Sequence, residues 1–539
     1  MGVKNLWDVF QENGEEVCIS QLNEECLRKH KRKLRLAVDA DLWRYHNRYR
    51  TSTSGSRASQ KAQEQRTCFL RLNSLLKAHV DAVFVFDGPQ KPEFKRNKRV
   101  PITNPMDFRW MKNLISDFGF TWIQAPGEAE AQCALLEMKG LVDFVLTDDV
   151  DALMFGCRNL LRSSSNSGLG SKESPAALFA TAFRISPNDS RYLTRPGIVL
   201  TAMMSGADYC PEGVKGCGIK TAKEIAKAGY GEKLIACDWL PLKLQDWKAE
   251  LERNLRNNEN NEFSNKHKAI VFDESFPSRD LFESYMNPAV ALPTEPIEWG
   301  KKPIIINLHQ FSSSCMNYTL QQFVSCLAPA IAIGQLAGGN TSIVKIHGTR
   351  VHDRLQLTEV RTSMYYCQVM AAVVDSEKSN MISELESEDQ PRKLWVAEYI
   401  FMQSESGKGV LEDYRSSLFE ATKTRKSKRL PEQKTNLDML WKGKAGKSNS
   451  EERNKTCKEN IKPRTKEIVE KTRTETKPLS LPSALSFCEM PSTPGSIINL
   501  SSSPSLSSSP PSHSQHIIST PISPLRPVFR RVIDLSDDD

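Results

Sequence analysis

Hydrophobic residues gather in four short runs within the first 150 positions, and acidic residues end or follow each run. The runs are LRLAVDADLW (34–43), VDAVFVFDG (80–88), GFTWIQ (119–124) and LVDFVLT (141–147). Helical patterns separate them, as at 67–79 and 129–139. Buried strands that alternate with helices predict an α/β fold with a central, mostly parallel sheet flanked by helices. Functional groups then gather where the carboxyl ends of the strands meet.

Acidic residues form the main chemical signal of the sequence. The seven that stand out are Asp39, Asp87, Glu128, Glu130, Asp149, Asp151 and Asp208. Carboxylate oxygens are the ligands that Mg²⁺ prefers, and two such ions roughly 4 Å apart can drive phosphodiester hydrolysis. Taken singly, each acid is better explained by a helix cap or by exposure to solvent. The seven together predict a two-metal site.

A glycine-punctuated turn runs into a helix at 213–228, GVKGCGIKTAKEIAKA. Glycine lets the backbone approach a phosphate, and the following helix presents its positive end. Lysines at 215, 220 and 223 would add phosphate contacts. Alone the turn is a weak signal, and the basic run Arg28–Arg35 is either a duplex contact or a solvated helix end.

Six motifs resemble the XPG/flap-endonuclease superfamily and occur in that family's order over roughly residues 1–290. They are MGVKNLW, AVDADLW, VFVFDGPQKPEFK, APGEAEAQC, LTDDVDALMFG and SGADYCPEGVKGCGIKTA. The resemblance implies a structure-selective, Mg²⁺-dependent endodeoxyribonuclease whose seven matching acids hold two Mg²⁺ ions, with Mn²⁺ able to substitute. It also implies a helix–two-turn–helix at about 208–240 that holds K⁺.

The resemblance further assigns residues that contact DNA. Lys95 is expected at the scissile phosphate as a catalytic residue. The expected DNA-binding residues are Gly2, Arg96, Arg99, Gly213, Lys215, Gly216, Gly218, Lys220 and Lys223.

A short spacer of about 40 residues separates Asp87 from Glu128, which resembles the GEN/Yen Holliday junction resolvases. An incomplete arch over the site would not require a free 5′ end, so continuous four-way strands could enter. We therefore expect a homodimer that resolves Holliday junctions by paired symmetric nicks and also cuts 5′ flaps and replication forks. The alternatives are a flap endonuclease or 5′ exonuclease, and an inactive branched-DNA scaffold.

Apolar runs return at 340–416, with SIVKIHGTRV, YYCQVMAAVV and KLWVAEYIFM read as strands. GEN-type resolvases carry a chromodomain at this place, so a divergent, DNA-contacting copy is expected. Its aromatic residues Tyr365, Tyr366, Trp395 and Tyr399 are interpreted as core rather than as a methyl-lysine cage. The expected layout is a nuclease core (1–300), a connecting segment (301–339), the chromodomain-like module (340–416) and a disordered tail (417–539).

The excess positive charge lies in the C-terminal part of the sequence and not in the part that is expected to fold. The chain has 539 residues and a net charge of +8, but residues 420–480 alone carry 18 Lys/Arg against 9 Asp/Glu, a local +9. Thirteen cysteines without a CxxC pair predict a reducing compartment. The N-terminus lacks an apolar signal-peptide core, and the sequence contains no run of 18 apolar residues, so neither a membrane span nor a membrane partner is expected.

The tail carries regulatory motifs. The cluster KTRKSKR (423–429) predicts nuclear localisation or non-specific DNA contact, or is simply solvated. Proline follows Ser509, Thr520 and Ser523, and Ser523 fits the pattern of a cyclin-dependent kinase. The segment Val532, Ile533, Asp534 and Leu535 resembles a SUMO-interacting motif. We expect a nuclear phosphoprotein that shuttles with the cytoplasm and binds SUMO or sumoylated proteins.

Overall fold

The computed structural model describes nearly two thirds of the chain. The described residues are 6–10, 13–41, 43, 57–92, 94–95, 98–99, 108–163, 179–186, 192–206, 212–342, 345–352, 355–362 and 392–428. They all belong to one compact unit, Met1–Lys444. The predicted phosphorylation sites and the SUMO-interacting motif lie outside the described residues.

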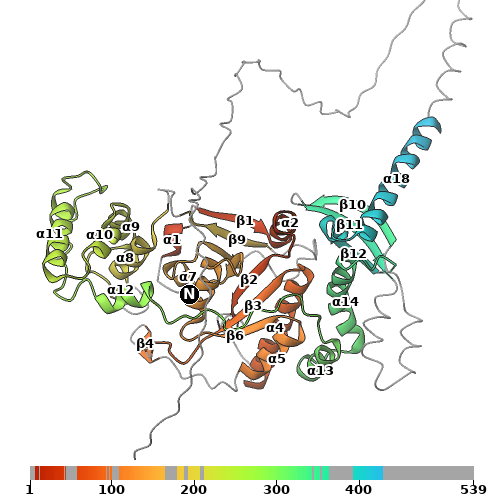
Figure 1. The fold of residues 1–539 in the computed structure, drawn as a ribbon, viewed down its shortest axis with the longest axis horizontal. Helices are drawn as coiled ribbons and strands as arrows, with labels where there is room; N and C mark the ends of the chain where they lie inside the picture. Colours follow the sequence, from red (N-terminus) through yellow and green to blue (C-terminus); the bar gives the residue numbers. More distant parts are fainter. Residues whose placement is uncertain are drawn as a thin grey trace, which may run out of the picture. The chain divides into compact units, whose positions relative to one another are not determined.

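A seven-stranded mixed sheet forms the centre of the unit, in the order β1-β9-β8-β7-β2-β3-β6 (Figure 1). The strands are β1 (Gly14–Cys18), β2 (Arg35–Asp39), β3 (Asp81–Phe86), β6 (Thr121–Gln124), β7 (Phe144–Leu146), β8 (Asn159–Ser163) and β9 (Phe179–Arg184). The five neighbouring strands from β8 to β6 run parallel to one another, whereas β9 runs antiparallel to both of its neighbours, β8 and β1. The predicted α/β fold with a mostly parallel sheet is therefore confirmed.

Alternate residues of the central strands enter two different cores, one on each face of the sheet. In β2, Leu36 and Val38 belong to one core and Ala37 to the other. The first face is covered by α2 (Ile19–His30), α4 (Arg57–Lys77) and α5 (Arg109–Asp117). The second face is covered by α6 (Ala129–Met138), α7 (Asp151–Met154) and α8 (Arg195–Ser205). Strands buried on both faces explain the continuous apolar runs of the sequence.

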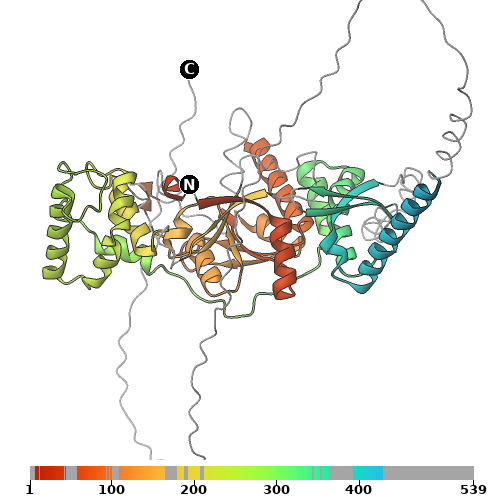
Figure 2. The same ribbon diagram turned by 90° about the horizontal axis from the view of Figure 1, so that it is seen from above.

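A helical lobe follows α8 and consists of α9 (Ile219–Lys227), α10 (Tyr230–Ala236), α11 (Pro241–Asn257) and α12 (Arg279–Met286). An extended segment then returns along the body, the strap of residues 287–304 (Figure 2). Its backbone is bonded to the body: the Gly127 N–H donates to the Ala289 carbonyl at 3.1 Å, and the Thr121 hydroxyl donates to the Glu298 carbonyl at 2.6 Å.

The segment expected to be only a connection, 301–339, contains α13 (Ile305–Met316) and α14 (Leu320–Ala337), and both helices pack against α4. By length and composition α14 could cross a membrane. Eight of its side chains are nevertheless buried, among them Phe323, Val324 and Leu327, which are part of the same core as α4. We interpret α14 as a core helix.

The C-terminal module is a three-stranded antiparallel sheet, β10 (Lys345–His352), β11 (Leu355–Thr362) and β12 (Arg392–Ala397), followed by α17 (Glu398–Phe401) and α18 (Glu405–Lys428). The predicted strand 393–402 ends at Ala397, because the aromatic residues that follow turn inward as a short helix. The last helix extends beyond the predicted boundary at 416. The predicted run 365–374 lies outside the described residues.

Candidate functional site

The sheet brings the predicted carboxylates to one edge. In the parallel register, Asp39 at the end of β2 lies opposite Val85 of β3, and Val38 lies opposite Leu146 at the end of β7. Asp87 directly follows β3, and Asp149 comes three residues after β7. The loop after β6 leads into α6, which is preceded by Glu128 and contains Glu130, and the loop after β7 leads into α7, which begins with Asp151. Six of the seven predicted acids thus belong to neighbouring strand ends.

A chain of hydrogen bonds orders three of these acids. The Thr147 hydroxyl donates to Asp39 Oδ2 at 3.4 Å and accepts from the Asp149 backbone N–H at 3.1 Å. Asp149 Oδ1 in turn accepts from the backbone N–H of Asp151 at 3.1 Å. All three carboxylates are only 2–3% exposed. The loop after β7 is therefore fixed around buried charges rather than left in solvent.

Asp87 lies at the start of α6. Its Oδ1 accepts from the Ala129 backbone N–H at 2.9 Å, where the first turn of the helix favours negative charge. Its Oδ2 lies 3.7 Å from Lys91 Nζ. The Asp87 backbone N–H donates to Asp41 Oδ2 at 2.7 Å. Sequence reasoning did not single out Asp41, although its i, i+2 spacing from Asp39 repeats that of Glu128 with Glu130 and of Asp149 with Asp151.

The surroundings of Cys133 in α6 show that several of the acids lie close together. Burial raises the pKa of its thiol, and the charges of Asp39, Glu130 and Asp87 raise it further. Glu128 occupies the N-cap position of the same helix and is 7% exposed. At least three carboxylates, which come from three different parts of the fold, therefore lie close enough to affect the pKa of one fully buried thiol.

The chemistry of this donor set fits a hard divalent cation. The described part of the site is rich in carboxylate oxygen, and like charges buried side by side are costly without cations. In the conformation described, no three His, Cys, Asp or Glu side chains among the described residues are arranged to hold a metal ion. Asp208 lies outside the described residues, just beyond the end of α8. The individual ligands therefore stay predictions.

The predicted basic contacts after Asp87 are only partly described. The backbone forms a small hairpin of β4 (Phe94–Lys95) and β5 (Lys98–Arg99), in which Phe94 pairs with Arg99. Arg96 and Gly2 lie outside the described residues. The hairpin thus contains two of the predicted contacts, Lys95 and Arg99.

The glycine-punctuated turn before α9 depends on glycine at two positions. Gly213 and Gly216 have positive φ of +61° and +80°, and a Cβ at Gly213 would lie 2.6 Å from the Met204 carbonyl. Gly218 is the N-cap residue of α9 and faces open space. Lys215 and Lys220 are exposed beside it, which places backbone N–H groups and two ammonium groups on one open turn.

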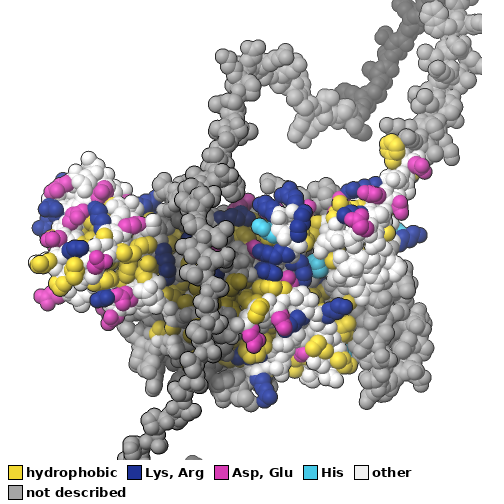
Figure 3. Space-filling model, viewed as in Figure 1, with side chains coloured by type: hydrophobic (Ala, Val, Ile, Leu, Met, Phe, Trp, Pro, Cys, Tyr) yellow, Lys and Arg dark blue, Asp and Glu magenta, His cyan; other side chains and the backbone are white. Residues whose placement is uncertain are grey.

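The basic run Arg28–Arg35 lies at the opposite edge of the sheet from the acids. Arg32 pairs with Asp143 at 2.7 Å and Lys33 with Asp81 at 2.6 Å, both at the amino ends of strands. A five-residue strand separates this edge from Asp39 by about 16 Å. The side chains at 28–31 are exposed, and Figure 3 shows basic side chains over the region of α2.

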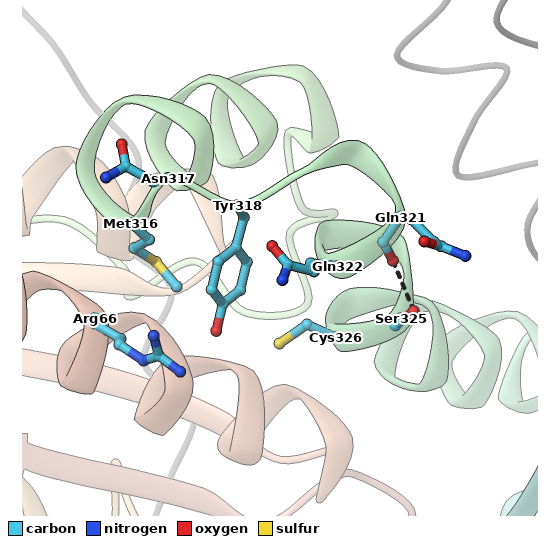
Figure 4. Close-up of a pocket in the computed structure, with 8 residues that line it drawn as sticks. All are labelled: Arg66, Met316, Asn317, Tyr318, Gln321, Gln322, Ser325 and Cys326. Carbon is cyan, nitrogen blue, oxygen red and sulfur yellow. Dashed lines mark hydrogen bonds between the residues drawn. The ribbon is translucent and has the colours of Figure 1, made fainter.

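A separate hollow of about 700 Å³ lies between α4 and the turn that joins α13 to α14 (Figure 4). It is lined by Arg66, Met316, Asn317, Tyr318, Gln321, Gln322, Ser325 and Cys326. The Arg66 guanidinium lies 5.5 Å from the centre of the Tyr318 ring, and the lining contains no carboxylate. This hollow therefore has no part in the carboxylate site.

Comparison with known proteins gives the family. The model of the XPG N-terminal domain matches residues 1–102, and that of the XPG I-region matches residues 119–208. DNA repair protein RAD2 of Saccharomyces cerevisiae is 30% identical over 231 residues, which are 41% of this chain and 20% of that protein. Flap endonuclease GEN homolog 1 of Mus musculus is 28% identical over 255 residues, 44% of this chain and 26% of that protein. The matched region thus spans about a quarter or less of these relatives.

Solved structures match over a greater share of the chain. A structure of the eukaryotic junction-resolving enzyme GEN-1 with cesium has a TM-score of 0.62 and 31% identity, and the match covers 77% of this chain and 100% of that one. The Holliday junction-resolving enzyme GEN1 with product DNA and Mg²⁺ gives 0.60 and 30%, with 77% and 99% covered.

The mixed sheet with its acidic edge, the turn before α9 and these matches define one class: the chain belongs to the XPG family of nucleases. Within that family it groups with the GEN junction-resolving enzymes, which it resembles over the full length of their solved chains.

Proposed function

We propose that the chain is a Mg²⁺-dependent, structure-selective DNA endonuclease. The observation that carries this proposal is the convergence of carboxylates from four parallel strand ends at one edge. Two Mg²⁺ ions bound there, or Mn²⁺ in their place, would supply an activated water and stabilise the leaving oxygen of a phosphodiester. Related GEN1 structures contain product DNA with Mg²⁺ and Mn²⁺, which supports this choice of metal.

The chain's own residues would bind and orient in this reaction. We propose the seven predicted acids as metal ligands: Asp39, Asp87, Glu128, Glu130, Asp149, Asp151 and Asp208. Thr147 orients Asp39, and the first turn of α6 orients Asp87. Lys95, on the hairpin that follows Asp87, would hold the scissile phosphate. No covalent intermediate with the protein is needed.

The proposed substrates are Holliday junctions, cut by paired symmetric nicks, together with 5′ flaps and replication forks. The match to an enzyme described as Holliday junction-resolving supports the first. The described part of the spacer between β3 and α5 is a small hairpin, in keeping with an incomplete arch. Because a four-way junction has near two-fold symmetry, two copies would act on it as a homodimer.

The helix–two-turn–helix would hold one duplex arm. Gly216 and Gly218 expose backbone at the start of α9, and Lys215 and Lys220 add positive charge there. We also propose a K⁺ ion at this turn, where positive φ at Gly213 turns the backbone sharply. A GEN-1 structure with potassium supports the choice of ion.

The remaining assignments concern location and regulation. We propose nuclear action in homologous recombination and DNA repair, with shuttling controlled by cyclin-dependent phosphorylation at Ser509, Thr520 and Ser523. The motif 532–535 would bind SUMO. The three-stranded module with its C-terminal helix is proposed as a chromodomain-like DNA contact. Tyr399 lies in the core there, so it does not contribute to an aromatic cage.

A test of the reaction compares three end-labelled substrates: an immobile four-way junction, a 5′ flap and a linear duplex. Each is incubated with the full chain in Mg²⁺ and in excess chelator. We expect cutting of the two branched substrates in Mg²⁺ alone. Cutting of the flap but not of the junction would favour a flap endonuclease, and binding without any cutting would favour an inactive branched-DNA scaffold.

A further inference from the structure

Lys223 differs from the other two lysines of the helix–two-turn–helix. All three were predicted as phosphate contacts, and Lys215 and Lys220 are indeed exposed. The side chain of Lys223 is half-buried, and its Nζ donates a hydrogen bond to the Val9 carbonyl at 3.1 Å. Lys220 and Lys223 are only three positions apart on α9, but their side chains have different surroundings.

The partner of Lys223 is the single turn of helix α1 (Trp7–Phe10). Val9 and Phe10 are 5% and 2% exposed and share one core with Ala222 and Ile225 of α9. Carbonyls near the end of so short a helix have no partner within it, and a cation placed there is favourable. The Lys223 ammonium therefore caps α1 and fixes it to α9.

The other side of α1 contacts the sheet. The Trp7 ring packs against Phe183 of β9 with ring centres 5.1 Å apart, and the Arg162 guanidinium lies 4.4 Å from the centre of the Trp7 ring. Next to Arg162 in β8, the Ser163 N–H donates to Asp148 Oδ1 at 2.8 Å, in the loop of the predicted metal ligands. In Figure 1, α1 lies between α9 and the β1–β9 end of the sheet.

We infer that Lys223 is a positioning residue for strand cleavage and not a phosphate ligand. By capping α1 it joins the turn that holds the duplex to the strand ends that carry the acids. The inference rests on the proposed nuclease function. Removal of its donor group should slow cleavage of bound DNA while the electrostatic part of DNA binding stays as it is.

The binding arm of the test measures the affinity of the full chain for a four-way junction over a range of salt concentrations, in chelator. Each phosphate contact that is lost lowers the slope of log affinity against log salt by about 0.9. We expect this fall for Lys220→Ala, the matched control on the same helix. Lys223→Met and Lys223→Gln should keep the wild-type slope, because neither removes a phosphate contact.

The kinetic arm measures single-turnover cleavage of the same junction in Mg²⁺ at saturating protein. Lys223→Met has no donor, and we expect a rate lower by about 10- to 100-fold, as for displaced active-site elements. Lys223→Gln keeps an N–H donor without the charge and should recover part of that loss. If Lys223→Met does not fold, as judged by its thermal midpoint, Lys223→Gln supplies both readouts.

Two results overturn the inference. One is a salt slope for the Lys223 variants that falls as it does for Lys220→Ala. The other is an unchanged slope together with an unchanged single-turnover rate. A wild-type protein that binds the junction but never cuts it would contradict the proposed function instead, and the salt slopes would then still decide whether Lys223 touches phosphate.

Discussion

Asp39 and Asp143 lie at opposite ends of neighbouring strands, and their surroundings give them different chemistry. Asp143, just before β7, accepts two hydrogen bonds from the Arg32 guanidinium at 2.7 and 2.8 Å and one from the Arg35 backbone N–H. Asp39 shares its edge of the sheet with other carboxylates. The charges of Asp39, Glu130 and Asp87 together raise the pKa of the nearby Cys133 thiol. Asp143 is therefore structural, whereas the surroundings of Asp39 suit a metal ion.

A substitution that neutralises one acid of the site should abolish DNA cleavage but leave the affinity for DNA nearly unchanged. We expect Asp39→Asn and Glu128→Gln to lower junction cleavage by at least about 100-fold, since each removes charge that would act in the transition state. Affinity for the junction, measured in chelator, should stay within a few-fold. Asp280→Asn, an exposed acid on α12, is the control. Full activity in either site variant would remove the metal assignment.

Asp143 predicts a pH dependence of stability. Burial raises the pKa of its carboxyl, but the hydrogen bonds from Arg32 and from the Arg35 backbone outweigh this, so the folded-state pKa is lowered. A lowered carboxyl pKa stabilises the fold above the ordinary value of about 3.9, and this contribution is lost as the pH falls through the folded-state pKa.

The measurement is the free energy of unfolding of wild type and Asp143→Asn between pH 3 and pH 7. The wild-type advantage should be constant from pH 5 to pH 7 and shrink below about pH 4. An advantage that grows on acidification would contradict the pairing of Asp143 with Arg32.

At the scale of elements, the sequence predicts the four neighbouring parallel strands β2, β3, β6 and β7 and misses β8, β9 and β1, which form the other side of the sheet. The strands β2, β3 and β7 are continuous apolar runs because cores lie on both sides. The edge strand β1 has three exposed residues followed by two buried ones, which gives no periodic signal. In the same way, α13 contains three serines and resembles a linker in its composition.

The acids themselves could be predicted because each follows an apolar run, but their partners could not. The link from Thr147 to Asp39 joins residues 108 positions apart, and the link from Asp41 to Asp87 spans 46 positions. Nothing local in the sequence indicates such pairs. The inward direction of Lys223 is hidden for the same reason, since its partner is 214 residues away.

Two glycines of the same turn should respond differently to an added methyl group. Gly213 has a φ of +61°, and a Cβ there would meet backbone atoms of Met204 and Gly206 at 2.6 Å. We expect Gly213→Ala to destabilise the protein by more than about 1 kcal/mol and to weaken junction binding. At Gly218, a Cβ meets nothing within 4 Å at a φ of −84°, so Gly218→Ala should keep the wild-type thermal midpoint. Equal midpoints for both variants would contradict the geometry of the turn.

The module of residues 340–428 is joined to the body by a buried hydroxyl. Tyr399 is 8% exposed, and its Oη accepts a hydrogen bond from Asn23 Nδ2 at 3.2 Å. Tyr399→Phe should lower the free energy of unfolding by about 1 kcal/mol. Tyr414→Phe removes a hydroxyl from the same module and is the control. A loss that is equal in the two variants would show that the bond to Asn23 contributes nothing.

At the scale of the whole molecule, the predicted boundaries at 300 and 339 do not separate independent cores. Phe323 of α14, Val360 of β11 and Leu36 of β2 belong to one hydrophobic cluster, so the module and the body share a core. Contacts between segments more than 300 residues apart, as between Asn23 and Tyr399, leave no trace in local composition. The change of pattern at 340 therefore marks a change of element type within a shared core.

Charge at this scale is equally uninformative about the site. The net charge is +8, but it falls to +1 for residues 1–419 once the tail segments 420–480 (+9) and 481–539 (−2) are set apart. Acids at one edge of the sheet offset basic groups at the other edge and on the turn before α9. The proposed binding of DNA would therefore depend on local clusters of charge rather than on the overall charge.

The most direct measurement uses a supercoiled plasmid that extrudes a cruciform, incubated with the full chain in Mg²⁺. An enzyme that places two symmetric nicks across a four-way junction converts this plasmid to a linear form whose ends map to opposite strands at the cruciform. We predict this linear product, and its loss both in chelator and in the Asp39→Asn variant. Nicked circles alone, or an uncut plasmid in the presence of Mg²⁺, would contradict the assignment as a junction resolvase.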